Sequence, residues 1–528
     1  MYLKNVLTDG EIEQSSSEPV QFGRAPLRIE DICAVAEGAR EASLDCSDDY
    51  RALIDAGHEF LADMLHDEGV IYGVTTGYGD SCTVSIPADQ VAELPLHITR
   101  FHGCGLGRIL DREEARAVVA ARLASLAQGH SGVRYVLLER LLWLLQEDIM
   151  PLIPAEGSVG ASGDLTPLSY VGALLVGERD ALYRGEIRPA KEIYNELGVK
   201  PLILQPKEGL ALMNGTAVMT ALACLAYKRA DYLSRLSSRL TSLAVLAMKG
   251  NAGHFDERLF RVKPHPGQGR VAARIRSDLN GWAQRHDDNR LQDRYSLRCA
   301  PHVIGVLEDS LPFMRQFIET ELNSANDNPI IDVSEKALLH GGHFYGGHIA
   351  FAMDSIKNCV ANLADLMDRQ MALLVDPRFN NGLPVNLSNA VAERASINHG
   401  FKAVQIGMSA WTAEALKNTM PASVFSRSTE CHNQDKVSMG TIAARDCLRG
   451  LELTEQVAAA LTLALTQAIA IRREAGGLQE DISDAVMNFY LSISNWFETV
   501  SEDRPLEHDL HFCLAEIRKQ SWELYTDE

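Results

Sequence analysis

Apolar residues recur every three or four positions along much of the second half of the chain, the spacing that places them on one face of an α-helix. The sequence predicts a very long helix that opens at Glu208 and ends at Gly250. A second long helix follows the same spacing over 353–374 and ends before Pro377. A third is predicted over 392–420, where another proline follows.

The stretch 447–471 is apolar on nearly every face. A helix of this kind must be buried, either inside a bundle or at a subunit interface. Several helices longer than about 25 residues make a bundle larger than one chain covers, which favours an oligomer. The predicted fold class is therefore mainly α, with a flexible tail over 1–25, an N-terminal domain over 26–207 and a long-helix bundle domain over 208–528.

The patterns in the N-terminal half are shorter. Helical patterns cover 28–65, some with acidic starts, and a longer helical stretch is predicted over 112–145. Residues 170–207 are predicted to form an excursion poor in strands, with turns at Gly185 and Gly198. The N-terminal domain is thus expected to be built from smaller elements than the bundle.

Composition narrows the class of protein. The chain has 528 residues and a net charge of −21, which argues against nucleic acid as a partner. Its ten cysteines are scattered without CxxC spacing, which indicates reduced thiols rather than a disulfide framework. The polar N-terminus lacks the pattern of a signal peptide, and no run of about twenty apolar residues predicts a membrane span. These features favour a cytoplasmic protein.

Glycines and small residues dominate the stretch 157–163, which lets backbone approach backbone. At its centre, Ala161-Ser162-Gly163 can cyclise. The Gly163 amide nitrogen attacks the Ala161 carbonyl, and loss of two waters, one from the Ser162 side chain, leaves a methylidene-imidazolone (MIO) ring, an electrophile. The alternatives are a tight turn or a phosphate-binding glycine loop, the second disfavoured because no Gly-Lys-Ser/Thr follows.

The block from Gly157 to Leu168 resembles the signature of the aromatic amino-acid ammonia-lyase and aminomutase family, in which this tripeptide becomes the MIO cofactor. Six separated blocks in the family's order cover about residues 70–440. The resemblance implies a fumarase/aspartase-like helix bundle with the MIO loop in the N-terminal domain. It also implies a homotetramer with shared active sites, and MIO as the cofactor with no metal and no nucleotide.

Two blocks before the MIO loop match the family. The glycine-rich loop 70–79 contains Tyr72, which the resemblance identifies as the catalytic base, although an ordinary glycine turn is the alternative. Because the ordinary pKa of tyrosine is about 10, such a site must stabilise the phenolate. Phe101 and His102 fall where the family contacts the substrate's aromatic ring. On residue type alone, His102 is a surface or helix-capping histidine.

Further blocks follow the MIO loop. The resemblance gives Asn214 to the cofactor carbonyl or the substrate amine, whereas its residue type also suits a cap or turn. Arg298 is expected to grip the substrate carboxylate with its planar guanidinium, and a structural salt bridge is the alternative. Tyr295 is expected near the reacting amine, and the spacing of Gln292, Tyr295 and Arg298 predicts one shared helical face.

A turn-rich loop over 323–329 contains Asn328, which matches the family's active-site asparagine, and Phe344 matches its aromatic contact. Three histidines nearby fit no standard zinc spacing, so the sequence predicts no metal site. They are His340, His343 and His348.

The residues that choose the substrate give a mixed signal. Gln434 stands where family members that act on histidine usually carry glutamate, and members that act on tyrosine or phenylalanine carry glutamine. His102 instead matches histidine enzymes and some aminomutases, and Phe101 matches phenylalanine enzymes. We expect an ammonia-lyase that converts L-tyrosine, or a similarly electron-rich aryl-alanine, to an aryl-acrylate. The alternatives are histidine deamination to urocanate, a 2,3-aminomutase that gives a β-amino acid, and a non-catalytic helical scaffold.

Overall fold

The computed structural model describes residues 18–67, 69–279, 291–476, 478 and 483–526. It is mainly helical with long helices, which confirms the predicted fold class. The chain forms two compact units. The first contains the chain up to Ala221 together with Leu322–Tyr345 and Ser428–Asp435, and the second contains the remaining segments. The sequence predicted one domain boundary, at residue 208, whereas the chain enters the first unit again in these two later segments.

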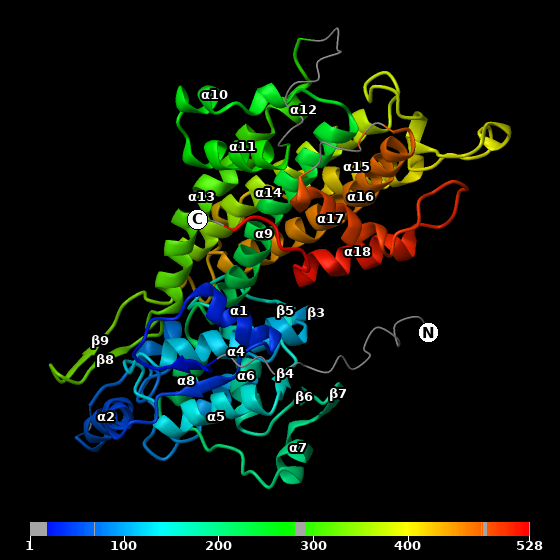
Figure 1. Cartoon of the computed structure of the whole chain (residues 1–528). Coiled ribbons are helices and arrows are strands. Elements are labelled where there is room, and N and C mark those ends of the chain that lie inside the picture. The colour runs from blue at the N-terminus through cyan, green and yellow to red at the C-terminus, as the bar shows by residue number, and fades with distance from the viewer. Residues whose placement is uncertain (1–17, 68, 280–290, 477, 479–482, 527–528) are drawn as a thin grey trace. The chain divides into compact units, whose positions relative to one another are not determined.

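In the part of the chain that the structure describes, the first unit combines short helices with four small sheets (Figure 1). Strands β4, β6 and β7 form an antiparallel sheet, β1 pairs with β2 in parallel, and β3–β5 and β8–β9 are antiparallel pairs. Helix α4 packs on α1 and α5, and α6 packs on α3 and α8. The elements are β1 (Val20–Phe22), α1 (Ile29–Glu37), β2 (Ala42–Leu44), α2 (Asp48–His66), α3 (Leu94–Phe101), β3 (Leu106–Ile109), α4 (Arg112–Leu126), α5 (Tyr135–Gln146), β4 (Met150–Pro151), β5 (Pro154–Glu156), α6 (Leu165–Leu175), β6 (Asp180–Tyr183), β7 (Glu186–Pro189), α7 (Ala190–Glu196), α8 (Glu208–Met213), β8 (Ile330–Asp332) and β9 (Ala337–Leu339).

Helix α4 is the buried centre of this unit. It begins with a capping box, in which the Asp111 carboxylate accepts from the Glu114 amide and Glu114 bonds back to the Asp111 amide. Every residue from Glu114 to Leu126 is buried, and most of them are alanine, valine or leucine. Arg122 lies in this apolar run with no exposed surface, so its guanidinium must find partners inside the unit.

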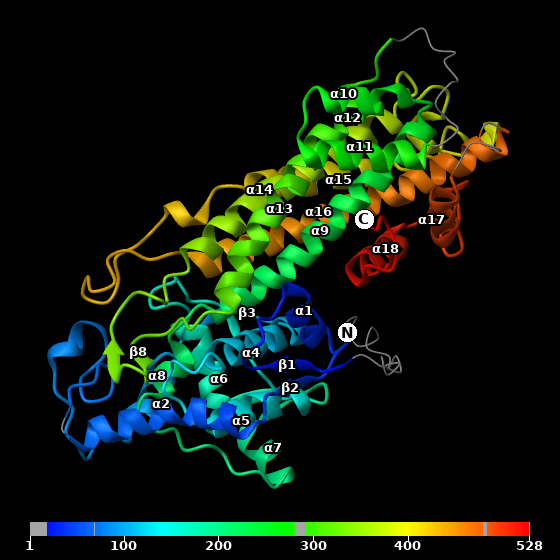
Figure 2. The ribbon, with the colours of Figure 1, turned by 60° about the vertical axis from the view of Figure 1, so that its left-hand side comes forward.

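The second unit is a bundle of long helices (Figures 1 and 2). Helices α14 and α16 lie side by side, with α15 and α18 packed against α16. The most apolar stretch of α16 is 89% buried, so the continuous apolar pattern belongs to a core helix. The helices are α9 (Ala217–Ala247, whose first residues belong to the first unit), α10 (Glu257–Arg261), α11 (Pro266–Asp278), α12 (Tyr295–Arg298), α13 (Ala300–Leu322), α14 (Gly347–Leu374), α15 (Lys402–Lys417), α16 (Gly440–Glu474), α17 (Asp484–Ser494) and α18 (Glu507–Lys519).

Two expectations for the N-terminal half need correction. The excursion over 170–207 contains a β-hairpin, β6–β7, and Gly185 lies in its turn with φ +77°. The turn at Gly198 is confirmed and follows α7. Within the predicted tail over 1–25, residues 1–17 lie outside the described part, but Val20–Phe22 forms a strand because it pairs with Ala42–Leu44.

Three of the predicted helices are interrupted or shorter. The stretch 112–145 is divided into α4 and α5, and 392–420 contains only α15 as an α-helix. The helix predicted to open at Glu208 breaks after Met213, and α9 starts at Ala217. The helix is interrupted at Gly215, which adopts φ +144°, a conformation that side chains rarely allow. This break places backbone, rather than a helix surface, beside Ser162.

Candidate functional site

A cavity of about 380 Å³ in the first unit has Ser162 in its wall. It gathers six of the residues that the sequence marks as site residues, although they come from separate segments of the chain. These are Tyr72, Phe101, His102, Ser162, Asn214 and Gln434. The remaining lining residues are Gly77, Tyr78, Gly79, Ser81, Ile98, Leu165, Leu210 and Glu430.

The backbone of Gly215 brackets the tripeptide loop. The Gly215 amide donates to the Ser162 carbonyl at 3.2 Å, and the Gly215 carbonyl accepts from the Asp164 amide at 2.7 Å. This is an isolated parallel bridge between Gly163 and Gly215. The two hydrogen bonds fix the peptide groups on both sides of Gly163 while leaving Gly163 itself in the middle.

Gly163 has no room for a side chain. Its φ is +76°, and a Cβ added there would lie 2.0 Å from the Gly215 carbonyl oxygen. Ser162 also adopts a left-handed conformation, with φ +52°. Within the described part of the chain, the Gly163 amide makes no hydrogen bond. A tight turn with a free amide nitrogen at Gly163 is what cyclisation onto Ala161 requires.

Two amide side chains hold Ser162 from the pocket side. Asn214 Nδ2 donates to the Ser162 carbonyl at 3.2 Å, and Gln434 Nε2 donates to Ser162 Oγ at 3.1 Å. Asn214 is buried, and its Oδ1 has no partner among the described residues. An orphaned buried acceptor of this kind marks a place for a donor from a ligand.

A buried carboxylate secures the other end of the loop. Asp164 Oδ1 accepts from Ser158 Oγ at 3.1 Å, and Oδ2 accepts from the Met219 amide at 2.9 Å. Asp164 has no exposed surface. The carboxylate therefore ties the tripeptide loop to the first turn of α9, so the loop is anchored at both ends.

Tyr72 lies in the glycine-rich loop and is half-buried. Its hydroxyl oxygen accepts from the Gly79 amide at 2.8 Å. Burial raises the pKa of Tyr72, whereas this hydrogen bond lowers it and the nearby Glu430 charge raises it further. Within the single chain, the phenolate is therefore not the favoured form. The nearby Tyr78 is more deeply buried, which raises its pKa as well.

The Glu430 carboxylate holds the same loop, accepting from the Asp80 amide at 2.9 and 3.1 Å. Glu430, Cys431 and His432 have φ values of 50°, 52° and 66°, three consecutive left-handed residues without a glycine. Each costs roughly 1–2 kcal/mol of backbone strain. A turn closed by Thr429 and Gln434 holds this conformation. The turn thereby presents Glu430 and Gln434 to one pocket.

His102 ends α3 at the pocket wall. Its Nδ1 lies 3.0 Å from the Ile98 carbonyl oxygen, which can only accept, so Nδ1 carries the proton. Burial lowers the pKa of His102, which keeps the ring neutral and leaves Nε2 as an acceptor. The Phe101 ring lies 4.3 Å away between centroids. The pair thus offers one apolar face and one hydrogen-bond acceptor.

Asn328 and Phe344 also belong to the first unit, but neither lines the cavity. Asn328 Oδ1 accepts from the Gly341 amide at 2.8 Å. The neighbouring His340 ring stands edge-on to Tyr72, 6.4 Å away between centroids. The segment therefore borders the glycine-rich loop 70–79. Among the described residues, no group of three or more His, Cys, Asp or Glu side chains is placed to hold a metal ion.

Gln292, Tyr295 and Arg298 lie in the second unit. The prediction that all three share a helical face is wrong, because α12 begins only at Tyr295 and Gln292 precedes it in a bend. The Arg298 guanidinium lies over the Tyr295 ring at 4.6 Å, and its Nε donates to the Asp293 carbonyl at 2.9 Å. Tyr295 is 72% exposed. None of the three lines the cavity of the first unit.

Lys207 and Asp327 form an ion pair in the first unit, and neither side chain has exposed surface. Lys207 Nζ donates to Asp327 Oδ2 and to the Ser131 carbonyl, both at 2.6 Å. Replacing Lys207 by Met leaves the Asp327 charge buried alone, so we expect the free energy of unfolding to fall by about 3–5 kcal/mol. Urea unfolding measures this loss.

The matched control is the double variant Lys207→Met with Asp327→Leu, which removes both charges. It should recover most of the lost stability. A single Lys207→Met variant as stable as the unaltered chain would contradict the pairing.

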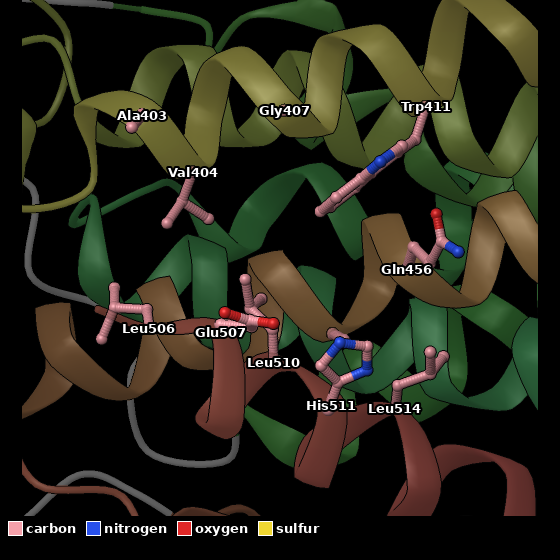
Figure 3. Close-up of a pocket in the computed structure, with 11 residues that line it drawn as sticks. Ala403, Val404, Gly407, Trp411, Gln456, Leu506, Glu507, Leu510, His511 and Leu514 are labelled. Atoms are coloured by element: carbon pink, nitrogen blue, oxygen red, sulfur yellow. The ribbon is translucent and has the colours of Figure 1, made fainter. Parts of the chain in front are cut away.

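A second cavity, of about 420 Å³, lies in the second unit between α15, α16 and α18 (Figure 3). Trp411 and Val404 reach into it from α15, opposite Leu510 and His511 from α18. Its lining is mainly apolar, and it contains none of the residues that the sequence marks as site residues. The cavity beside Ser162 is therefore the candidate active site.

A sequence model of the aromatic amino acid lyases matches residues 27–494 of the chain. The chain belongs to the aromatic amino acid lyase family. It is thus a carbon–nitrogen lyase, and members of this family use an MIO cofactor. The alternative of a non-catalytic helical scaffold is therefore wrong, and the expected enzyme class is confirmed.

Within the aromatic amino acid lyases, the chain is similar both to histidine ammonia-lyases and to a tyrosine aminomutase. It is 36% identical to the histidine ammonia-lyase of Koribacter versatilis over 93% of this chain and 96% of that protein. It is 34% identical to that of a Geobacillus strain, over 92% and 94%. Its structure is similar to tyrosine aminomutase from Streptomyces globisporus, with a TM-score of 0.89 and 33% identity over 95% and 97% of the two chains. The histidine ammonia-lyase of Trypanosoma cruzi gives a TM-score of 0.86 and 30% identity over 95% and 94%.

The site fits the family's cofactor. The Gly163–Gly215 bridge, the free Gly163 amide and the left-handed Ser162 are the features that ring closure needs. Glu430 and Tyr78 were not predicted as site residues. Glu430 lies four residues before Gln434, and the turn closed by Thr429 and Gln434 brings both side chains to one pocket.

Proposed function

We propose that Ala161-Ser162-Gly163 matures to MIO and that this chain eliminates ammonia from an aromatic L-amino acid, with L-histidine as the leading substrate. The observation that carries the proposal is the convergence of Tyr72, His102, Asn214 and Gln434 on the cavity that contains Ser162. When formed, the ring supplies an electrophilic methylidene carbon that accepts the substrate amine and makes it a good leaving group.

The chain's own residues perform the remaining steps. Asn214 Oδ1, the orphaned acceptor, receives an N–H of the substrate amine, while Gln434 and Asn214 Nδ2 keep residue 162 in place. Tyr72 removes the β-proton. In the homotetramer proposed below, another copy of the chain supplies Arg298 to bind the substrate carboxylate, with Tyr295 beside it, and Gln292, Asn328 and Phe344 complete the shared binding site.

Two findings support L-histidine over L-tyrosine. The curated relatives named above are histidine ammonia-lyases at 34–36% identity over more than nine-tenths of the chain. The argument against histidine is that Gln434 carries no negative charge. Glu430, however, lines the same cavity and supplies a carboxylate that suits a protonated imidazole.

L-tyrosine is the second candidate, favoured by the neutral amide of Gln434 and by the similarity to tyrosine aminomutase. A phenol hydroxyl can donate to His102 Nε2 as an imidazole N–H can.

Purified enzyme is mixed in parallel with L-histidine, L-tyrosine and L-phenylalanine, and products are separated by chromatography. Urocanate supports the leading substrate and coumarate the second. A β-amino acid identifies an aminomutase, and no product from any of the three contradicts the proposal.

His102 is expected to distinguish these substrates from phenylalanine. Replacing His102 by Leu removes the acceptor at Nε2, so kcat/KM for L-histidine and L-tyrosine should fall about tenfold, the value of one hydrogen bond. L-phenylalanine has no ring donor and should lose less. Steady-state kinetics on the three substrates measures the difference.

Phe101→Leu is the matched control, because it alters ring packing without touching the acceptor. It should affect the three substrates alike. An equal loss for all three in the His102→Leu variant would refute a hydrogen-bonding role.

We also propose that the chain forms a homotetramer with shared active sites and that this tetramer is located in the cytoplasm. Large apolar side chains stand exposed on the second unit's helices, among them Val306, Phe313 and Phe351, each at least half exposed in the single chain. Such side chains favour burial against further copies. All ten cysteines are free thiols, which suits a reducing compartment.

A further inference from the structure

Arg122, on α4, is a fully buried cation that neither substrate binding nor proton transfer explains. Its Nη1 donates to Asn326 Oδ1 at 3.1 Å, and its Nη2 donates to the Ala211 carbonyl, the residue three positions before Asn214. Nε has no partner among the described residues. Burying a charge costs free energy of folding, so a buried guanidinium at this position indicates a specific role.

Asn326 is the meeting point of this network. Its Oδ1 accepts from Arg122, from Ser125 Oγ at 3.0 Å and from the Thr216 amide at 3.4 Å. Both Ser125 and Arg122 lie on α4, whereas Thr216 starts the segment that leads into α9. One carbonyl oxygen thus ties α4 to the backbone directly after Gly215.

The two side chains also form a wall behind Gly215. A Cβ added to Gly215 would lie 2.3 Å from Arg122 Nη1 and 2.4 Å from Asn326 Oδ1. On its other side, Gly215 makes the two hydrogen bonds to Ser162 and Asp164. Gly215 is therefore enclosed between these two side chains and the tripeptide loop, so it cannot move away from the loop.

The wall is held by charge as well as by packing. Burial lowers the pKa of Arg122 to about 10, and the charges of Asp327 and Asp164 oppose this shift. Arg122 is thus still protonated at neutral pH. Asp327 is itself paired with Lys207, so the cation belongs to a continuous buried network rather than to a single pair.

We propose that Arg122 and Asn326 are positioning residues for maturation of the cofactor: they press Gly215 against the loop and so set the distance between the Gly163 nitrogen and the Ala161 carbonyl. This inference rests on the proposed function, because it requires that MIO forms. In the reaction, a bond forms between Gly163 N and the Ala161 carbonyl carbon. The Ala161 oxygen leaves as water with the amide protons of Ser162 and Gly163, and Ser162 loses its hydroxyl with its α-proton as the second water. No oxidant is needed.

The test follows ring closure in the full chain by mass. The unaltered chain and the variants are produced by cell-free synthesis, and the fraction that is lighter by two waters is measured at intervals. Asn326→Leu keeps the branching at Cγ and the number of heavy atoms but removes the acceptor, and we expect ring closure about tenfold slower, the cost of a misplaced reacting pair. Asn326→Asp restores an acceptor oxygen opposite Arg122 and should return the rate to within about twofold.

Tyr50→Phe is the matched control. The Tyr50 hydroxyl donates to the Ala127 carbonyl at 2.6 Å and is equally buried, but it does not touch the loop. It should lower the melting temperature without changing the maturation rate. A purely structural role for Asn326 would give the same pattern in Asn326→Leu, namely lower stability with the unaltered rate, and that result overturns the proposal.

Ser125→Ala provides a second, milder variant if Asn326→Leu does not fold. It removes one of the three donors that orient Asn326, and we expect a twofold to threefold slower ring closure, whereas the unaltered rate overturns the proposal. Failure of the proposed function is seen separately. In that case the unaltered chain never becomes lighter by two waters, and the variants cannot differ from it.

Discussion

Replacing Ser162 by Ala is expected to reduce turnover by roughly 10³-fold or more, the scale on which covalent catalytic groups act. The Ser162 hydroxyl is the leaving group that creates the exocyclic methylidene, so without it the electrophile cannot form. Among the described residues, the Ser162 side chain makes one hydrogen bond, from Gln434 Nε2, so the loop should stay folded without it. Ammonia release and the near-ultraviolet absorbance of the ring measure the two losses, which should occur together.

The matched control is Ser169→Ala in α6. Ser169 is a buried serine of the same unit whose Oγ donates to the Thr166 carbonyl at 2.7 Å, outside the pocket. It should retain both absorbance and turnover. A Ser162→Ala variant that still releases ammonia at the unaltered rate would show that the reaction does not use a ring derived from Ser162.

Replacing Tyr72 by Phe is expected to lower kcat by about 10²–10⁴-fold, the usual contribution of a general base. The ring should still form, because among the described residues Tyr72 makes no hydrogen bond to residues 161–163 and its hydroxyl accepts from the Gly79 amide. Intact mass and steady-state kinetics therefore separate this variant from Ser162→Ala. We predict that the Tyr72→Phe variant is still lighter by two waters but has lost turnover.

The same residue predicts a pH dependence. Burial raises the pKa of Tyr72 above its ordinary value of 10, so the phenolate is the minor form at neutral pH and its fraction grows as the pH rises. Below that pKa, the base-dependent part of kcat/KM should rise about tenfold per pH unit. Tyr183→Phe is the control, since its buried hydroxyl has no hydrogen-bond partner in the described part of the chain. A flat profile in the unaltered enzyme that Tyr72→Phe leaves unchanged would exclude Tyr72 as the base.

The fold class was predictable because long amphipathic helices repeat one signal many times. The spacing of apolar residues over 353–374 gives the end of α14 at Leu374, just before Pro377. The break between α8 and α9 was not predictable from this signal. Asn214-Gly215 can sit in a helix at modest cost, and only the demand for a backbone partner beside Ser162 forces Gly215 to φ +144°.

The residues of the candidate site also fall into those that the sequence could predict and those that it could not. Tyr72, His102, Asn214 and Gln434 could be chosen from sequence because each lies in a block of family-like residues, and the fold brings them to one cavity. Glu430 could not, because its place depends on three consecutive left-handed residues that no local pattern predicts.

Arg122 and Asn326 were missed for a related reason. In sequence, one is an arginine in an alanine-rich helix and the other an asparagine in a loop, and 204 positions separate them. Neither local context indicates that they meet. Their link through Gly215 to the tripeptide exists only after the first unit has folded.

The central claim is that the chain builds its own electrophile. The most direct test is the mass of the proteolytic peptide that contains residues 161–163 from the purified, unaltered protein. The account predicts a peptide lighter by two waters, with fragmentation placing the whole change between Ala161 and Gly163. A peptide of full mass, from protein that is folded and still releases ammonia from an aromatic amino acid, would contradict the account.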